Sequence, residues 1–283
     1  MEDMINKLSV LTIATLATLV CKSALAEIGS QSISTDLSQC GPVIGHEMGM
    51  WEFFSVIPSP KQVDRVLRTD LKFVKVSLQK LKDESWVVSH NPSQIVLDGA
   101  RKPHRIEFSK TTWEEIQKLR GEPHSKVPIF RLTEYIARDQ GRLCWMLSPK
   151  QPINKSLIAE LTEAKILQRT VLLTSHISEV QWLQSFSADQ VPSYTGRVNS
   201  SAALNTLVGL HAPLWAIEID KNDETPAVIQ AVHDANYKAY VDSMRYSKTY
   251  EFFGTACKKV FALGADYTQT NRPLQCMRKM GVY

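Results

Sequence analysis

Two histidines and two lysines lie within or directly after short apolar runs of this sequence, and these four residues are the best suited to chemistry. They are His46, Lys75, His90 and Lys150. An imidazole has an ordinary pKa of about 6.5, so two histidines can share general base and general acid work at neutral pH. Phosphoryl transfer needs mainly positioning and positive charge, which lysines supply. His46 and His90 are therefore candidates for proton transfer, and Lys75 and Lys150 are candidates for binding an anion, if the fold brings the four side chains together.

Eight short apolar runs alternate with segments of helical spacing, which is the pattern of a parallel α/β sheet. The runs that we assign as strands are 42–45, 71–78, 143–147, 170–174, 193–198, 214–219, 239–243 and 265–270. Residues 226–236 and 249–263 have helical spacing, and Gly264 ends the second segment. A single (β/α)8 barrel takes about 250 residues. We therefore predict an α/β fold, a TIM barrel at residues 27–283.

Residues 86–89 also have a strand-like pattern, but they are not one of the eight predicted barrel strands. Together with the residues around them they predict a small insertion after the second strand, at about residues 83–120. In barrel enzymes the site lies at the carboxyl ends of the strands. The polar residues expected there are His46, Lys75, Ser77, Ser148, Lys150, His176, Glu218, Asp220 and Asp242. His90 joins them if the insertion folds over the mouth of the barrel.

Several of these segments resemble the glycerophosphodiester phosphodiesterase family, a family of barrels related to phospholipase C. Its members carry His-Arg-Gly, Glu-x-Asp, His-Asp and Glu-x-Lys at four strand ends. The corresponding segments here are His46-Glu47-Met48, Lys75-Val76-Ser77, His90-Asn91 and Ser148-Pro149-Lys150. Residues 111–119 resemble the threonine-led helix of the family, and residues 263–273 resemble its Gly-Ala-Asp and Thr-Asp-x-Pro ending, with Asn271 in place of aspartate.

The resemblance implies a divalent cation that is held by the carboxylates of Glu-x-Asp and Glu-x-Lys. The three positions are Lys75, Ser77 and Ser148 here, and none of them is acidic. Calcium and magnesium need anionic oxygen ligands, and a lysine would repel the ion. We therefore predict that the family metal site is lost and that no cofactor is used. Bacterial phosphatidylinositol-specific phospholipases C resemble this arrangement, because a basic side chain occupies the calcium position there.

Three functions stay open at this point. The first is an exported, metal-independent phosphodiesterase or lyase that acts on glycerophosphodiesters or phospholipid head groups. Its catalytic residues would be His46 as base and His90 as acid, and Lys75 and Lys150 would be the phosphate-binding residues. The second is a catalytically inactive barrel that binds a phosphodiester or a partner protein. The third is an unrelated barrel hydrolase that uses Glu218, Asp220 or Asp242 as an acid/base pair. The resemblance favours the first two.

The first residues of the chain predict export. An apolar run at residues 8–20 follows Lys7 and precedes Ala24-Leu25-Ala26, which is typical of a signal peptide cleaved after Ala26. The run is shorter than the roughly 20 residues of a membrane-spanning helix, and no later run is apolar enough to span a bilayer. We therefore expect residues 1–26 to be removed and the protein to be periplasmic or extracellular.

Charge and cysteine usage constrain the partners and the compartment. The 33 lysines and arginines are scattered among 29 acidic residues, which argues against nucleic acid as a partner. Export permits disulfides, and four cysteines remain after cleavage. Cys144 lies in an apolar run, which favours a buried free thiol. Cys40 and Cys276 flank the first and last strands, so a bridge between them is one expectation. The oligomeric state is left open.

Overall fold

The computed structural model describes residues 37–49, 59–220 and 222–281. These residues form a barrel of eight parallel strands, because β1 pairs with β2 on one side and with β11 on the other. In order of pairing, the strands are β1 (Val43–His46), β2 (Phe73–Lys80), β6 (Cys144–Pro149), β7 (Thr170–Leu172), β8 (Ser193–Val198), β9 (Ala216–Ile219), β10 (Ala239–Asp242) and β11 (Tyr267–Thr270). The predicted TIM barrel is thus confirmed, and each strand overlaps a predicted run. The predicted signal peptide lies outside the described residues.

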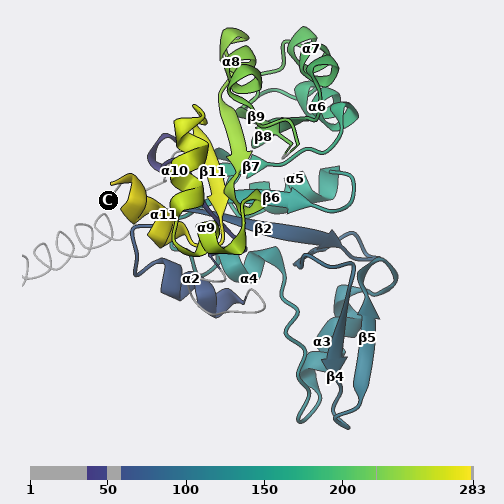
Figure 1. Ribbon diagram of the computed structural model, residues 1–283. Helices are drawn as coiled ribbons and strands as arrows, with labels where there is room; N and C mark the ends of the chain where they lie inside the picture. The colour runs from purple at the N-terminus through teal and green to yellow at the C-terminus, as the bar shows by residue number, and fades with distance from the viewer. Residues whose placement is uncertain (1–36, 50–58, 221, 282–283) are drawn as a thin grey trace, which may run out of the picture. The chain divides into compact units, whose positions relative to one another are not determined.

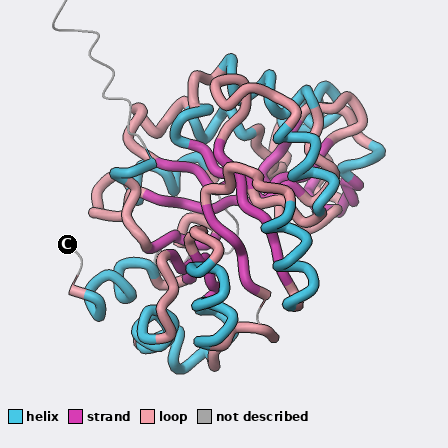
Figure 2. The backbone as a smooth tube through the Cα atoms, turned by 90° about the horizontal axis from the view of Figure 1, so that it is seen from above, coloured by secondary structure: helices cyan, strands magenta, loops and turns pink. Residues whose placement is uncertain are grey.

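Helices surround the strands (Figures 1 and 2). They are α2 (Pro60–Val66), α4 (Leu132–Ile136), α5 (Lys155–Glu163), α6 (Ile177–Gln184), α7 (Ser201–Gly209), α8 (Pro226–Asp234), α9 (Lys248–Phe252), α10 (Thr255–Ala262) and α11 (Pro273–Met280), with short 3-10 turns η1 (Leu37–Gln39), η3 (Leu167–Arg169) and η4 (Ser243–Arg245). Asn154, Ser200 and Thr225 cap α5, α7 and α8 by accepting a backbone N–H. No helix in the described part of the chain is long and apolar enough to cross a membrane.

The predicted helical segment at 249–263 is two helices, α9 and α10. Gly254 separates them with a φ of +70°, in the left-handed region that glycine adopts without strain. A Cβ at this position would lie 2.8 Å from the backbone oxygen of Gln275 in α11. The break therefore lets α10 pack closely against α11 and leaves α9 beside the carboxyl end of β11.

The insertion follows β2, as predicted. Its first strand, β3 (Trp86–Val88), pairs antiparallel with the last residues of β2. The hairpin of β4 (Ser93–Leu97) and β5 (Pro103–Glu107), the turn η2 (Phe108–Lys110) and α3 (Trp113–Gly121) follow and share a small apolar core of their own. β3 pairs with the carboxyl end of β2. Ser89 and His90, which follow β3, therefore lie at the mouth of the barrel.

The side chains of β2 alternate between two cores. Phe73 belongs to the cluster inside the barrel with Ile44 and Met146, whereas Val74 and Val76 belong to the larger core between strands and helices. Residues two and four positions after Phe73 therefore point into the barrel. These are Lys75 and Ser77, and both are buried. The direction of Lys75, which the apolar pattern of the sequence left open, is inward.

Two disulfides correct the cysteine predictions. They join Cys40 to Cys144 and Cys257 to Cys276. Cys144 is the first residue of β6 and faces the interior of the barrel, where Cys40 meets it in the same cluster. Cys276 lies in the outer core on α11, against Cys257 of α10. The expected free thiol at Cys144 and the expected Cys40–Cys276 bridge are therefore both wrong, because Cys40 and Cys276 lie in different layers.

Candidate active site at the mouth of the barrel

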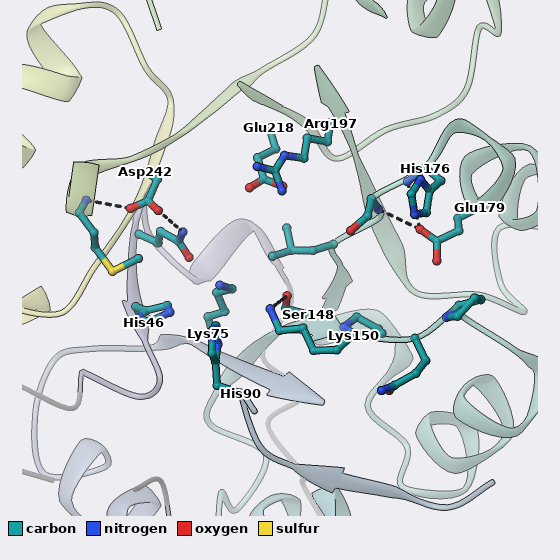
Figure 3. A pocket seen from close by; sticks show the side chains of 17 residues that line it. His46, Lys75, His90, Ser148, Lys150, His176, Glu179, Arg197, Glu218 and Asp242 are labelled. Carbon is teal, nitrogen blue, oxygen red and sulfur yellow. Dashed lines mark hydrogen bonds between the residues drawn. The ribbon is translucent and has the colours of Figure 1, made fainter. Parts of the chain in front are cut away.

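A pocket of about 380 Å³ opens at the carboxyl ends of the strands (Figure 3). Its lining includes all four predicted site residues, which are His46, Lys75, His90 and Lys150. They come from β1, β2, the residue pair after β3 and the end of β6. The barrel thus brings together residues that are up to 104 positions apart in the sequence. Ser148, His176, Arg197, Glu218 and Asp242 line the same pocket.

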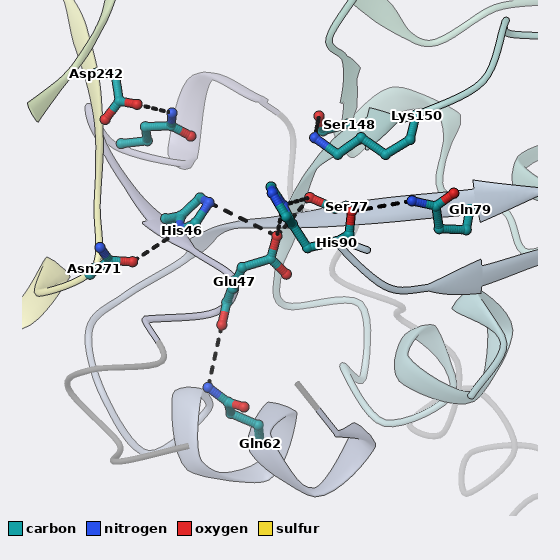
Figure 4. A network of polar contacts seen from close by, with 11 residues as sticks. His46, Glu47, Gln62, Ser77, Gln79, His90, Ser148, Lys150, Asp242 and Asn271 are labelled. Atoms are coloured by element: carbon teal, nitrogen blue, oxygen red, sulfur yellow. Dashed lines mark hydrogen bonds and ion pairs between the residues drawn. The ribbon is translucent and has the colours of Figure 1, made fainter. Parts of the chain in front are cut away.

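His46 is held in one orientation by the neighbouring strand. Its Nδ1 lies 2.8 Å from Oδ1 of Asn271, which directly follows β11 (Figure 4). A carbonyl oxygen only accepts, so Nδ1 carries the proton and donates it to Asn271. The other ring nitrogen, Nε2, lies 3.9 Å from Oε1 of Glu47. In the neutral ring, Nε2 is therefore the nitrogen that can accept a proton.

The electrostatic surroundings keep the His46 ring neutral. Burial lowers its pKa to about 4, and the positive charge of Lys75 acts in the same direction. The carboxylate of Glu47 and the hydrogen bond to Asn271 favour the protonated ring, but they are outweighed. At neutral pH His46 is therefore a proton acceptor, as expected for the base, although a pKa this low limits its strength as one.

Glu47 is the residue of this site that sequence analysis missed. It was noted only as a departure from His-Arg-Gly, but its carboxylate is buried beside the two histidines that line the pocket. Its Oε1 accepts a hydrogen bond of 2.7 Å from Ser77 Oγ and lies within 4 Å of a nitrogen of both His46 and His90. A carboxylate directly after a strand-end histidine was the signal that could have pointed to it.

The turn that carries Glu47 is fixed by its backbone. Glu47 has a φ of +44°, which is uncommon for a residue with a side chain. Gln62 of α2 donates to the carbonyl oxygens of Glu47 and Met48 and holds the turn in place. Burial alone would raise the pKa of Glu47, but its contacts with His90, His46, Lys75 and Ser77 lower it. The carboxylate is therefore ionised at neutral pH.

His90 is oriented through Ser77. Its Nδ1 lies 3.1 Å from Ser77 Oγ. The single hydroxyl proton of Ser77 is donated to Glu47, so Ser77 accepts from His90, and Nδ1 of His90 carries a proton. Gln79 also donates to the backbone oxygen of His90. The chain Glu47–Ser77–His90 thus fixes a ring whose side chain is 60% exposed and leaves its Nε2 available to a substrate.

The three positions that the family resemblance assigns to a metal, Lys75, Ser77 and Ser148, do not fit a divalent cation. Lys75 already carries a positive charge, the hydroxyl of Ser77 is used by Glu47, and Ser148 accepts a hydrogen bond of 3.4 Å from Lys150 Nζ. Within the described ranges, no group of three or more His, Cys, Asp or Glu side chains is placed to hold a metal ion. The three positions offer one ammonium group and two hydroxyls, which are unsuited to calcium or magnesium.

Lys150 completes a positive region with Lys75. Partial burial at the pocket wall lowers the pKa of Lys150, and the charge of Lys75 lowers it further. The two ammonium groups therefore repel each other when no anion is bound between them. An anionic ligand between them would relieve this repulsion.

The opposite wall of the pocket is made of β8, β9 and β10. Arg197, which sequence analysis did not consider, donates to Asp220 at 2.7 Å. Asp242 accepts from the backbone of Met244 and from Gln269. Burial raises the pKa of Asp242, as it does the pKa of Glu218. These contacts give Asp220 and Asp242 roles in holding the wall, which weakens the hypothesis of an acid/base pair there.

His176 lies on the same side of the pocket and begins α6. The carboxylate of Glu179 accepts from its backbone N–H and from that of Ser175. This is the arrangement of a helix start. His176 thus lines the pocket from the start of a helix, beside Glu179 (Figure 3).

Acidification is expected to destabilise the fold through His46. The folded protein protonates this ring only at about pH 4, whereas the ordinary pKa is 6.5. Between these values the unfolded chain binds the proton first, so stability is fully present above pH 6.5 and is lost as the pH falls to about 4, by roughly 2–3 kcal/mol. Denaturant unfolding at pH 7 and pH 4.5 measures this loss, and His46→Gln should show a smaller one. An equal loss in both proteins would contradict the assignment.

Comparisons with known proteins find the fold among solved structures. No family model and no curated protein matches the sequence. A phosphodiesterase from Oleispira antarctica, solved with its product sn-glycerol-3-phosphate, is 15% identical with a TM-score of 0.64, over 86% of this chain and 98% of that one. A glycerophosphoryl diester phosphodiesterase from Parabacteroides distasonis is 14% identical with a TM-score of 0.63, over 88% of each chain.

A third match is the glycerophosphodiester phosphodiesterase of Thermotoga maritima. It is 11% identical with a TM-score of 0.62, over 85% of this chain and 98% of that one. The three matches span 88% to 98% of the solved chains. Together with the closed eight-strand sheet, they show that this chain has the fold of the glycerophosphodiester phosphodiesterases.

Proposed function

We propose that this protein is an exported phosphodiesterase or lyase that cleaves glycerophosphodiesters or phospholipid head groups without a metal ion. The observation that carries the proposal is the placement of two imidazoles on either side of one carboxylate. A nitrogen of His46 and a nitrogen of His90 both lie within 4 Å of Glu47 Oε1, and Lys75 and Lys150 line the same pocket. Two proton-transfer groups therefore share a pocket with two phosphate-binding cations.

The residues suit an in-line displacement at phosphorus. Neutral His46 takes the proton of the attacking hydroxyl, which belongs either to water or to the substrate itself in a lyase. The bond from this oxygen to phosphorus forms as the bond to the leaving alcohol breaks, and protonated His90 gives its Nε2 proton to the leaving oxygen. Lys75 and Lys150 stabilise the charge on the remaining phosphate oxygens. Glu47 pairs with the protonated His90 and stabilises its positive charge.

The substrate class is supported by the related structures and the compartment by the disulfides. The Oleispira antarctica phosphodiesterase binds sn-glycerol-3-phosphate as its product. In this protein the two lysines of the pocket, Lys75 and Lys150, suit the same kind of anion. Disulfides persist in oxidising compartments, and the two bridges of this chain are compatible with export.

The test is a cleavage assay with and without metal. The purified protein is incubated with glycerophosphocholine, and released choline or glycerol is measured in EDTA and in calcium. We expect turnover that EDTA does not lower and that is lost in His90→Ala. Turnover that requires calcium or magnesium would contradict the metal-independent mechanism.

The second candidate, an inactive barrel that binds a phosphodiester, is favoured by the loss of all three acidic positions at Lys75, Ser77 and Ser148. It predicts that sn-glycerol-3-phosphate binds in calorimetry although no substrate is turned over. Turnover above the His90→Ala control excludes this candidate, and binding without turnover selects it.

A further inference from the structure

Three exposed aromatic side chains gather on one short segment of the barrel rim. Among the described residues, only four large apolar side chains are exposed, and three of them lie within four positions: Tyr250, Phe252 and Phe253. Their exposed fractions are 44%, 50% and 54%. The fourth, Ile95, lies on the hairpin of the insertion. Scattered apolar residues are ordinary on a protein surface, whereas a local cluster marks a contact surface.

The charges around these rings have one sign. The exposed charged residues between positions 243 and 263 are Lys248, Lys258 and Lys259. The one acidic residue of this segment, Glu251, is 2% exposed. The aromatic and cationic groups touch one another, because Lys259 Nζ lies 3.8 Å from the ring centre of Tyr250 and Arg272 Cζ lies 4.6 Å from that of Phe252. We call Lys248, Tyr250, Phe252, Phe253, Lys258 and Lys259 the α9 patch.

Glu251, the buried residue of α9, connects the α9 patch to the candidate active site. Glu251 of α9 accepts hydrogen bonds from Thr270 Oγ1 at 2.7 Å and from the backbone N–H of Asn271 at 2.6 Å. Asn271 in turn holds His46. Met244, which lies between β10 and α9, lines the pocket itself. α9 therefore lies beside the carboxyl end of β11, at the end of the barrel where the pocket opens.

We propose that the α9 patch docks the protein on the surface of an anionic phospholipid bilayer. Phenylalanine and tyrosine rings are stable at the boundary between head groups and acyl chains, and lysines around them are attracted to anionic lipid. Residues 243–263 expose no acidic side chain that an anionic head group would repel. That the docked bilayer also supplies the substrate rests on the proposed function, whereas docking itself does not depend on catalysis.

Vesicle sedimentation tests the docking. The mature protein, without the predicted signal peptide at residues 1–26, is mixed with vesicles of phosphatidylcholine alone or with phosphatidylglycerol, and the bound fraction is measured in low and high salt. We expect binding to anionic vesicles that weakens in high salt. The variant Phe252→Ser/Phe253→Ser should bind at least about tenfold more weakly, because two rings no longer enter the interface. Ile95→Ser removes an apolar side chain on the insertion that is more exposed, at 70%, and should bind as the unaltered protein does.

Hydrogen exchange identifies the segment of the chain that contacts the vesicle. Anionic vesicles should slow exchange in residues 246–263 and leave the hairpin at residues 93–107 unchanged. Vesicle binding without protection of 246–263, or equal binding by the double variant, overturns the proposal. A halving of the molecular mass on introducing Phe252→Ser/Phe253→Ser, measured by light scattering, would instead assign the patch to a second copy of the chain.

A comparison of two substrates separates docking from catalysis. The double variant should cleave soluble glycerophosphocholine at the normal rate and phospholipid in anionic vesicles at least about tenfold more slowly, in line with its weaker binding. If neither substrate is cleaved by any variant while docking persists, the proposed function fails and the lipid-binding surface stands. If glycerophosphocholine is cleaved but no vesicle binds, docking fails and the proposed function stands.

Discussion

Replacing His90 with glutamine is expected to lower the rate of phosphodiester cleavage by roughly 10²–10⁴-fold, the usual contribution of a positioned general acid. Glutamine is similar in size and can still hydrogen-bond to Ser77, but it cannot deliver a proton to the leaving oxygen. The loss should appear in kcat more than in KM, because the proton moves only in the transition state. Initial rates with glycerophosphocholine measure it.

The control for this prediction is a histidine outside the pocket. His104 lies exposed on the hairpin of the insertion, so His104→Gln should leave the rate unchanged. A substrate with a good leaving group, such as a nitrophenyl ester, needs less help from an acid and should restore most of the rate to His90→Gln. If cleavage persists at the normal rate in His90→Gln, the assignment of this residue as the acid is wrong.

Replacing Lys75 with methionine is expected to lower kcat/KM by roughly 10²–10³-fold, the scale found for removing one fixed group that stabilises transition-state charge. Methionine fills a similar volume at this buried position, so the barrel should stay folded. The same change removes a positive charge that lowers the pKa of His46. That pKa should therefore rise from about 4, yet stay below 6.5, because burial is the larger cause and is unchanged.

Two measurements check this prediction independently. Steady-state kinetics give the loss of activity, and the imidazole signals in an NMR titration give the pKa of His46 even if the protein is only a binding barrel. Lys72→Met is the matched control, because Lys72 precedes β2 and is exposed. A His46 pKa that is the same in Lys75→Met and in the unaltered protein would show that Lys75 does not act on the site.

Local patterns were sufficient to predict the barrel. Each of the eight strands is a short apolar run, and even the run with the weakest pattern, at residues 193–198, coincides with β8 (Ser193–Val198). The helix α8 (Pro226–Asp234) lies within the segment predicted at residues 226–236, and Thr225 caps its first turn. Strand formation, helix capping and the order of elements depend on residues that are neighbours in sequence, so the sequence is enough to predict them.

The pairing of side chains across strands was decided by the tertiary structure. The direction of Lys75 follows from the register of β2 against β1 and β6, which the apolar run 71–78 does not contain. The role of Glu47 depends on a left-handed turn that aims its carboxylate at Ser77 and His90. The disulfide partners depend on whether a cysteine faces the interior or the outer layer.

The sequence by itself thus determined the fold, the histidines and lysines to consider, and the absence of acidic residues at the family's metal positions. Only the tertiary structure decided that a single carboxylate, Glu47, lies between both imidazoles, and that an aromatic and cationic segment borders the same mouth. The physical reason for this difference is that residue type and local spacing are properties of the sequence itself. Distances among β1, β2, β3 and α9 instead arise when the sheet closes and sets the register of strands that are far apart in sequence.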